Sequence, residues 1–286
     1  MKTLLGAHIS IAGGIYLAPR RGAELACTAI QIFLKNAMQW QAKPYNLEEI
    51  TQFKDNLSKS NIKIIVAHDT YLINLGSNNS SLLSKSRQAF LDELKRCYLL
   101  DIPYLIAHPG AHGGAGEEKG LETIAESLNY VFAEMNNCPT MVLLETTAGQ
   151  GTTLGHSFDH LGRIIELTES KARVGVCFDT CHVYAAGYDI SSEKGYHETI
   201  RLFNQAIGLK NLKAFHLNDS KRELNSHVDR HEHIGMGKIG LLPFKLIMSD
   251  PNYSQIPKII ETPKGDNLGG DLDRKNLNLL RSFVTF

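Results

Sequence analysis

The sequence predicts an α/β fold of the (β/α)8 barrel class, formed as a single domain over residues 1–286. Eight short apolar runs alternate with amphipathic segments from end to end, without a linker or a break in composition. The runs are almost continuous in Val, Ile, Leu and Phe, which is typical of strands buried on both faces. The length of 286 residues also suits one such barrel.

The eight apolar runs are the predicted strands, at residues 4–9, 29–34, 62–67, 104–107, 141–144, 174–178, 212–215 and 258–260. An open doubly wound sheet is the alternative arrangement of such units. That fold usually carries a G-x-G-x-x-G turn after its first strand, and the Gly13-Gly14 pair does not have this spacing. The closed barrel is therefore the preferred prediction.

The segments between the strands carry apolar residues at spacings of three and four, the pattern of helices with one buried face. The first stripe follows a predicted capping box formed by Asn46 and Glu49. The stripes are Leu47/Ile50/Phe53/Leu57, Leu121/Ile124/Leu128/Phe132, Ile200/Phe203/Ile207 and Leu277/Leu280/Val284. We interpret all four as faces that pack on the barrel, not as cofactor sites.

Composition narrows the class of protein. Thirty basic and thirty acidic residues give no overall attraction to nucleic acid or to an anionic membrane. The N-terminal apolar run is too short for a signal sequence, and no stretch approaches the ~20 apolar residues of a membrane span. The five cysteines are odd in number and resemble no disulfide framework, so we expect a soluble, cytoplasmic protein. Cys177 and Cys181 could be metal ligands, but buried small side chains explain them better.

A histidine or an acid stands at the carboxyl end of nearly every predicted strand. His8 ends the first strand, and the third to eighth strands are followed by His68, His108, Glu145, Asp179 with His182, His216 and Glu261. From His68 onward, the successive strand ends are separated by 34 to 45 residues, which matches one strand–helix unit plus a loop. All these side chains should therefore meet at one rim of the barrel. Without a metal, such a ring of acids would resist ionisation, so the pattern predicts a metal centre.

The segment after the seventh strand, residues 218–242, is long for a strand-to-helix connection, which usually takes 2–6 residues. It contains VDRHEHIG, with Asp229 and His231 two positions apart. In a locally extended backbone both side chains point the same way and could hold one ion together with His182. A solvated polar loop is the alternative interpretation.

Without His8, the inventory contains nine potential ligands with nitrogen or carboxylate oxygen, a set that suits zinc, or less well manganese or iron. They are His68, His108, Glu145, Asp179, His182, His216, Asp229, His231 and Glu261. Nine ligands exceed the need of one ion and suffice for two or three if a carboxylate bridges. Three divalent ions with four carboxylates would make the site net positive and attractive to phosphate, although the chain is neutral. Clustered divalent ions fit in-line phosphoryl transfer, which needs no serine, cysteine or lysine nucleophile and no organic cofactor.

These residues lie in motifs that resemble the endonuclease IV family of apurinic/apyrimidinic endonucleases. The motifs are VAHDTYLINL, AHPGAHGG, LLETTAGQG, VGVCFDTCHVYAAGYD, FHLNDSK, VDRHEHIGMGKIG and IIETP, and the resemblance spans essentially the whole chain. It implies a TIM barrel with three zinc ions. It also implies hydrolysis of the phosphodiester 5′ to an abasic nucleotide in duplex DNA, which leaves a 3′-hydroxyl and a 5′-deoxyribose phosphate, and a 3′ end-cleaning activity.

The resemblance further implies how the ligands are divided. His68 and His108 would hold one zinc, and Glu145 would bridge it to a second ion. The second ion would also take Asp179, His216 and Glu261, and the third would take His182, Asp229 and His231. Glu145, Asp179 and Glu261 are the expected catalytic carboxylates.

DNA contacts are expected from the loops after the second, third and seventh strands. In LKNAMQW, Met38 stands where the family leads us to expect a basic residue, so it could wedge into the base stack but not pair with phosphate. Tyr71 and Leu72 match the family's third-strand loop, with ordinary loop packing as the alternative. Asn36, Asn218 and Lys221 are candidate phosphate contacts. His8 is expected to orient a ligand or phosphate, and His112 has no assigned role.

Two other functions remain open at this point. A sugar isomerase or epimerase of related barrel fold would need at most two metals and would leave Asp229 and His231 without a role. A non-catalytic DNA- or metal-binding protein is the third hypothesis. A monomer is expected.

Overall fold

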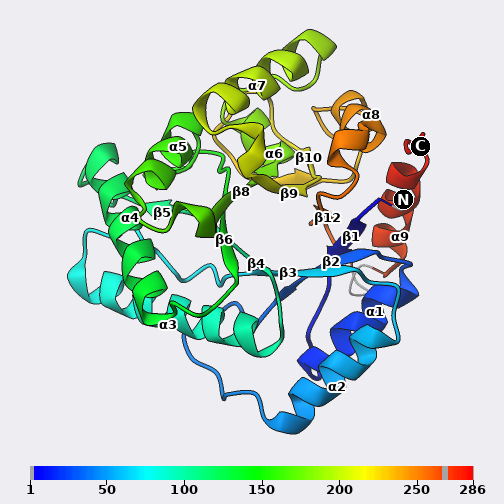
Figure 1. Ribbon diagram of the computed structural model, residues 1–286. Coiled ribbons are helices and arrows are strands. Elements are labelled where there is room, and N and C mark those ends of the chain that lie inside the picture. Colours follow the sequence, from blue (N-terminus) through cyan, green and yellow to red (C-terminus); the bar gives the residue numbers. More distant parts are fainter. Residues whose placement is uncertain (1–2, 266–269, 286) are drawn as a thin grey trace.

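The computed structural model describes residues 3–265 and 270–285. Eight parallel strands close into a barrel in the order β1-β12-β9-β8-β6-β4-β3-β2, with helices around the outside (Figure 1). The strands are β1 (Leu5–His8), β2 (Ala29–Phe33), β3 (Ile64–His68), β4 (Tyr104–Ala107), β6 (Met141–Glu145), β8 (Val174–Asp179), β9 (Leu212–His216) and β12 (Lys258–Ile260). The predicted (β/α)8 barrel is confirmed, and every predicted strand is present.

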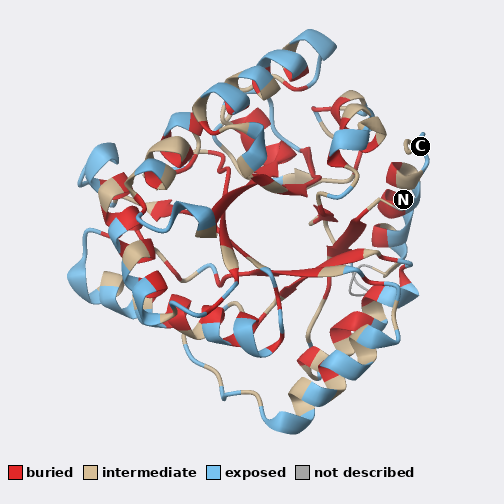
Figure 2. Ribbon diagram, in the orientation of Figure 1, coloured by how far each residue is buried: buried red, intermediate tan, exposed pale blue. Residues whose placement is uncertain are grey.

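The outer ring contains α1 (Ala18–Glu24), α2 (Leu47–Ser58), α3 (Ser80–Leu99), α4 (Glu117–Glu134), α5 (Phe158–Leu167), α6 (Thr180–Ala185), α7 (Glu193–Ala206), α8 (Leu242–Ser249) and α9 (Gly270–Arg281). The helices turn exposed faces outward and buried faces to the strands (Figure 2). The Asn46–Glu49 capping box is present at the start of α2. Ile207 and Val284 lie just beyond the ends of α7 and α9, where the sequence pattern placed them inside the helices.

Two apolar layers make up the core. The larger lies between strands and helices and includes Phe53, Leu128 and Phe203. The smaller takes residues at matching positions of the strands, such as Val66, Ile106 and Cys177, and therefore fills the barrel interior. All five cysteines are free and buried, which agrees with their interpretation as small apolar side chains.

Two short antiparallel ribbons stand in the connections at the carboxyl ends of the strands. Strand β5 (Gly110–Ala111) pairs with β7 (Thr153–Leu154), and β10 (Asp219–Ser220) pairs with β11 (His231–Glu232). Each ribbon shapes a loop that carries side chains of the rim. Among the described residues, no helix has the length and apolar character needed to cross a membrane.

Candidate metal centre

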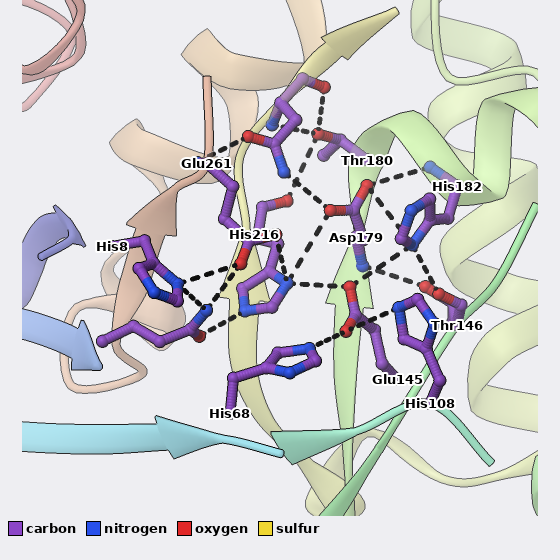
Figure 3. Close-up of polar contacts among 12 residues, drawn as sticks. His8, His68, His108, Glu145, Thr146, Asp179, Thr180, His182, His216 and Glu261 are labelled. Carbon is purple, nitrogen blue, oxygen red and sulfur yellow. Dashed lines mark hydrogen bonds and ion pairs between the residues drawn. The ribbon is translucent and has the colours of Figure 1, made fainter. Parts of the chain in front are cut away.

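Six of the nine predicted ligands are positioned by the ends of barrel strands. His68, Glu145, Asp179 and His216 are the last residues of β3, β6, β8 and β9, while His108 and Glu261 follow β4 and β12. Parallel strands of a barrel end at the same rim, so six strands deliver these groups to one place. In Figure 3, the labelled histidines and carboxylates converge, and dashed lines join Glu145 to His68, His108 and His216.

The nine predicted ligands form three groups in which one donor atom from each residue lies within 4.8 Å of the others. The groups are His68/His108/Glu145, Glu145/Asp179/His216/Glu261 and His182/Asp229/His231. This division of the side chains is the one that the family resemblance implied. The first two groups share Glu145, and Cys181 also lies within the same distance of Asp179 and His231.

Glu145 turns one oxygen toward each of its two groups. Its Oε2 lies 3.0 Å from His68 Nε2 and 3.4 Å from His108 Nε2, while its Oε1 lies 2.8 Å from His216 Nδ1. The carboxylate is fully buried, so both oxygens are shielded from bulk solvent. A carboxylate in this arrangement is placed to bridge two cations.

The third group shows the clearest fit to a metal. Among the residues that the structure describes, the buried Nε2 atoms of His182 and His231 have no hydrogen-bond partner, although they lie 3.2 and 3.3 Å from the two oxygens of Asp229. Their opposite ring nitrogens face the carbonyls of Thr146 and Glu261, at 2.8 and 3.2 Å. A ring that donates its Nδ1–H to a carbonyl holds the Nε2 lone pair free for a cation. Two imidazoles and a carboxylate suit zinc, with a fourth position open.

The electrostatics keep the central carboxylates ionised. Burial alone would raise the pKa of Glu145 and of Glu261, but the neighbouring histidines, His216 first, lower both pKa values well below the ordinary range. Burial lowers the pKa of His68, but the hydrogen bond to Glu145 and the negative charges of Glu145, Asp69 and Glu261 together raise that pKa to about 9. Ionised carboxylates are the form that metal binding requires.

Sequence reasoning missed Gln31, a fully buried side chain on β2. Its Oε1 accepts a hydrogen bond from His216 Nε2 at 2.7 Å, and its Nε2 donates to Glu261 Oε1 at 2.5 Å and to His8 Nδ1 at 2.9 Å. The amide therefore holds His216 with its Nδ1 lone pair toward the second group. The available signal was one amide in the apolar run AIQIF, because a buried amide needs partners.

His8 and Asn218 also orient the second group. His8 Nδ1 lies 3.5 Å from Glu261 Oε1, which fits the expected orienting role. Asn218 is fully buried; its Nδ2 donates to Asp179 Oδ2 and its Oδ1 accepts from the Glu261 amide, both at 2.7 Å. The expected phosphate contact of Asn218 does not fit this geometry, because both ends of its amide are already used inside the protein.

The other candidate DNA contacts lie on the surface or at its edge. Met38 and Tyr71 are 72% and 66% exposed, and Leu72 is half-buried. Asn36 is exposed and accepts a hydrogen bond from the Met38 amide at 3.0 Å, so it shapes this turn. Lys221 is exposed, and its Nζ lies 3.9 Å from Glu232 Oε2. His112 lies outside the three groups, and its Nδ1 accepts from the amides of Gly114 and Gly116.

The long segment after β9 is folded back onto the rim by Asp219. This buried carboxylate accepts hydrogen bonds from the amides of Gly235, Gly237 and Ile239. The β10–β11 ribbon then places Asp229 and His231 beside His182. The segment therefore packs onto the rim and does not form a solvated polar loop.

Comparisons with known proteins agree with this geometry. A family model described as "Xylose isomerase-like TIM barrel" matches residues 19–283. The chain is 50% identical over 279 residues to a "Probable endonuclease 4" of Chloroflexus aurantiacus, covering 98% of this chain and 97% of that protein. It is 49% identical over 284 residues to a protein of the same name from Geotalea daltonii, with 99% of both covered.

Solved structures give the same picture. The crystal structure of endonuclease IV from Thermus thermophilus superposes with a TM-score of 0.85 at 33% identity, covering 98% of each chain. A D-psicose 3-epimerase from Clostridium cellulolyticum has a TM-score of 0.73 at 15% identity, covering all of both chains, and shares the fold alone. The similarity to the endonuclease proteins covers nearly the whole chain, so this chain belongs to the endonuclease IV family, built on the xylose isomerase-like TIM barrel.

Proposed function

We propose that this protein is a DNA repair endonuclease that hydrolyses the phosphodiester 5′ to an abasic site in duplex DNA. The products would be a 3′-hydroxyl and a 5′-deoxyribose phosphate, and blocked 3′ ends would be cleaned by the same centre. The observation that carries the proposal is the set of three adjoining donor groups, two of which share Glu145. Family membership supports the same substrate class.

Three zinc ions are the proposed cofactors, one for each donor group, and no organic cofactor is needed. Bound zinc would polarise the phosphoryl group and stabilise charge on the attacking and leaving oxygens. Glu145 and Asp179 are fully buried and would hold the ions apart at fixed positions. The Glu261 side chain keeps 17% exposure at the mouth of the barrel, so it is the catalytic carboxylate nearest to an incoming phosphate.

The duplex would lie across the rim, where Tyr71 and Met38 project. Extruding an abasic nucleotide costs a few kcal/mol, and apolar or aromatic wedges help to hold the opened stack. Tyr71 contacts Phe33 with ring centroids 5.5 Å apart, and this contact supports the tyrosine ring from the barrel side. Asn36 and Lys221 are the remaining polar groups proposed to face the DNA backbone. We further propose that one domain, as a monomer in the cytoplasm, carries this activity.

A sugar isomerase or epimerase is the second candidate, because such enzymes share the barrel. It is not favoured. The third group, His182/Asp229/His231, would have no role in a one- or two-metal sugar enzyme. The high identity is to proteins named as endonucleases, while the likeness to epimerases is at the level of fold.

The decisive experiment is incision of a duplex that carries a single abasic site, without added magnesium, with the undamaged duplex as substrate control. We expect a nick on the 5′ side, and Glu261→Gln should retain the fold but lose most of the activity. Glu134→Gln, an exposed change at the far end of α4, is the matched control. Turnover of ketose sugars with no nicking would assign the protein to the second candidate.

A further inference from the structure

A group of metal-competent side chains lies apart from the central rim, between the N-terminal ends of two outer helices. Glu117 is the first residue of α4, His156 lies just before α5, and His160 is in its first turn. One donor atom from each residue lies within 4.8 Å of the others. His160 Nε2 is 3.4 Å and His156 Nε2 is 4.0 Å from the two oxygens of Glu117.

The imidazole of His156 is oriented for binding. Its Nδ1–H donates to the carbonyl of Thr153 at 3.0 Å, so the Nε2 lone pair faces Glu117. The two histidine rings meet edge to face, with centroids 4.6 Å apart.

His160 is buried, and burial and its neighbour His156 lower the pKa of its ring, which favours the neutral form. Its Nδ1 faces the Gly155 amide at 3.4 Å, a long contact at the limit of a hydrogen bond. Metal binding through Nε2 would move the ring proton to Nδ1 and give up this contact.

The site is open to solvent on one side. A surface cavity of about 640 Å³ is lined by Glu117, His160 and neighbouring polar residues, among them Glu118, Asp159 and Arg163. An ion can therefore enter without unfolding of either helix, and a water molecule can complete its coordination. Two histidine nitrogens, one carboxylate oxygen and water form a tetrahedral set that zinc accepts.

We propose that Glu117, His156 and His160 bind an additional divalent transition metal ion, with zinc as the best fit, outside the trinuclear centre. This ion would fasten α4 to the segment between β6 and α5. The same segment touches the third donor group at two points: the Thr146 carbonyl faces His182 Nδ1 at 2.8 Å, and Gln150 Oε1 accepts from the Asp229 amide at 2.8 Å. An ion bound by Glu117, His156 and His160 would therefore restrict the motion of the segment that positions His182 and Asp229.

The test is the zinc content per chain at controlled free zinc, measured by elemental analysis on the full chain. Glu117→Gln and His156→Ala should each bind one zinc fewer than the unchanged protein. His197→Ala, which removes an exposed histidine of α7, should bind the same amount. Glu117→Gln keeps an oxygen that can accept a hydrogen bond from His160 but is a poor zinc ligand. If Glu117 only accepted a hydrogen bond from His160, Glu117→Gln would therefore bind as much zinc per chain as the unchanged protein.

Thermal unfolding during zinc titration gives an independent reading. After the tight sites are filled, further zinc should raise the melting temperature of the unchanged protein and of His197→Ala but not of Glu117→Gln. Equal zinc content and equal zinc response in all variants would overturn the proposal. The proposal does not depend on the nuclease function. His182→Ala should lose a central ion and keep the outer one, so failure at one site can be told from failure at the other.

Discussion

Gln31 shows how one side chain can set the chemistry of its neighbours. Its amide joins His216, Glu261 and His8 through three hydrogen bonds inside the barrel. Only one orientation of the amide fits, because the Glu261 carboxylate can only accept and must face the NH2 group. Gln31 is therefore a positioning residue for two of the proposed zinc ligands.

Gln31→Met should weaken zinc binding at the second group by about 10–100-fold, because groups that orient metal ligands have effects of this size. The change keeps the shape of the side chain but leaves His216 Nε2–H without a partner and frees Glu261 to turn. The measurement is zinc retained against a competing chelator, followed by the nicking assay. Gln205→Met, an exposed change on α7, is the control. Normal zinc retention in Gln31→Met would show that the amide does not position these ligands.

The sequence predicts the ligands that stand at the ends of strands. It does not predict the loop side chains that form hydrogen bonds to those ligands. Parallel strands of a barrel must end at one rim, so His68, Glu145 and Asp179 could be placed together from spacing alone. Asn218 could not be placed in this way, because no pattern in a loop shows which polar side chain folds inward. Its two hydrogen bonds to the metal groups depend on the approach of β8 and β12 from either side.

Among the elements, the junction of β8 and α6 performs two tasks. Asp179 ends the strand and also caps α6, accepting a hydrogen bond from the His182 amide at 2.9 Å. The cap fixes the first helical turn, so His182 points into the third donor group while Asp179 faces the second. A short helix directly after the strand therefore connects two parts of the proposed zinc centre.

This division predicts a pattern of zinc loss. His182→Ala and His231→Ala should each remove one ion, and the double variant should remove no more than either single one, because both histidines belong to one group. His108→Ala combined with His182→Ala should instead remove two. The measurement is zinc per chain by elemental analysis at fixed free zinc. If the His182/His231 pair lost two ions, the division into groups would be wrong.

The capping box of α2 gives a prediction about stability. Asn46 Oδ1 accepts from the Glu49 amide at 2.9 Å, and Glu49 Oε2 accepts from the Asn46 amide at 3.0 Å. Asn46→Ala should lower the free energy of unfolding by about 1 kcal/mol, since it leaves an amide of the first turn without a partner. Urea unfolding at saturating zinc measures it. Asn137→Ala, an exposed change in a turn, should have almost no effect.

Elements differ in how far the sequence reveals them. The eight barrel strands and the helical stripes could be predicted because their apolar runs or periods extend over three or more residues. The ribbons β5–β7 and β10–β11 could not, because strands of two residues have no period to detect. Pairing of these ribbons depends instead on contacts within the loops. For example, Asp219 in β10 accepts hydrogen bonds from the amides of Gly235 and Gly237.

For the whole molecule, the two ends of the barrel differ in character. The carboxyl ends of the strands carry the donor groups and the exposed Met38 and Tyr71, whereas the amino ends are closed by apolar packing. The chain as a whole is neutral, so general attraction to DNA is weak. Binding should therefore depend on the cations of the centre and on side chains that enter the base stack.

Tyr71→Ala should raise the dissociation constant for an abasic duplex by about 5- to 150-fold, because stacking of one base on an aromatic ring contributes about 1–3 kcal/mol. Tyr98→Ala is a matched control: this tyrosine is 51% exposed, but it lies near the end of α3, where the chain returns to the amino ends of the strands. Fluorescence anisotropy with catalytically disabled Glu261→Gln as the background would measure both variants without cleavage. If the two tyrosine variants weakened binding equally, Tyr71 would not enter the DNA. If neither affinity changed while zinc content stayed normal, the duplex would have to be opened by other residues of the rim, and Met38→Ala would be the next variant to measure.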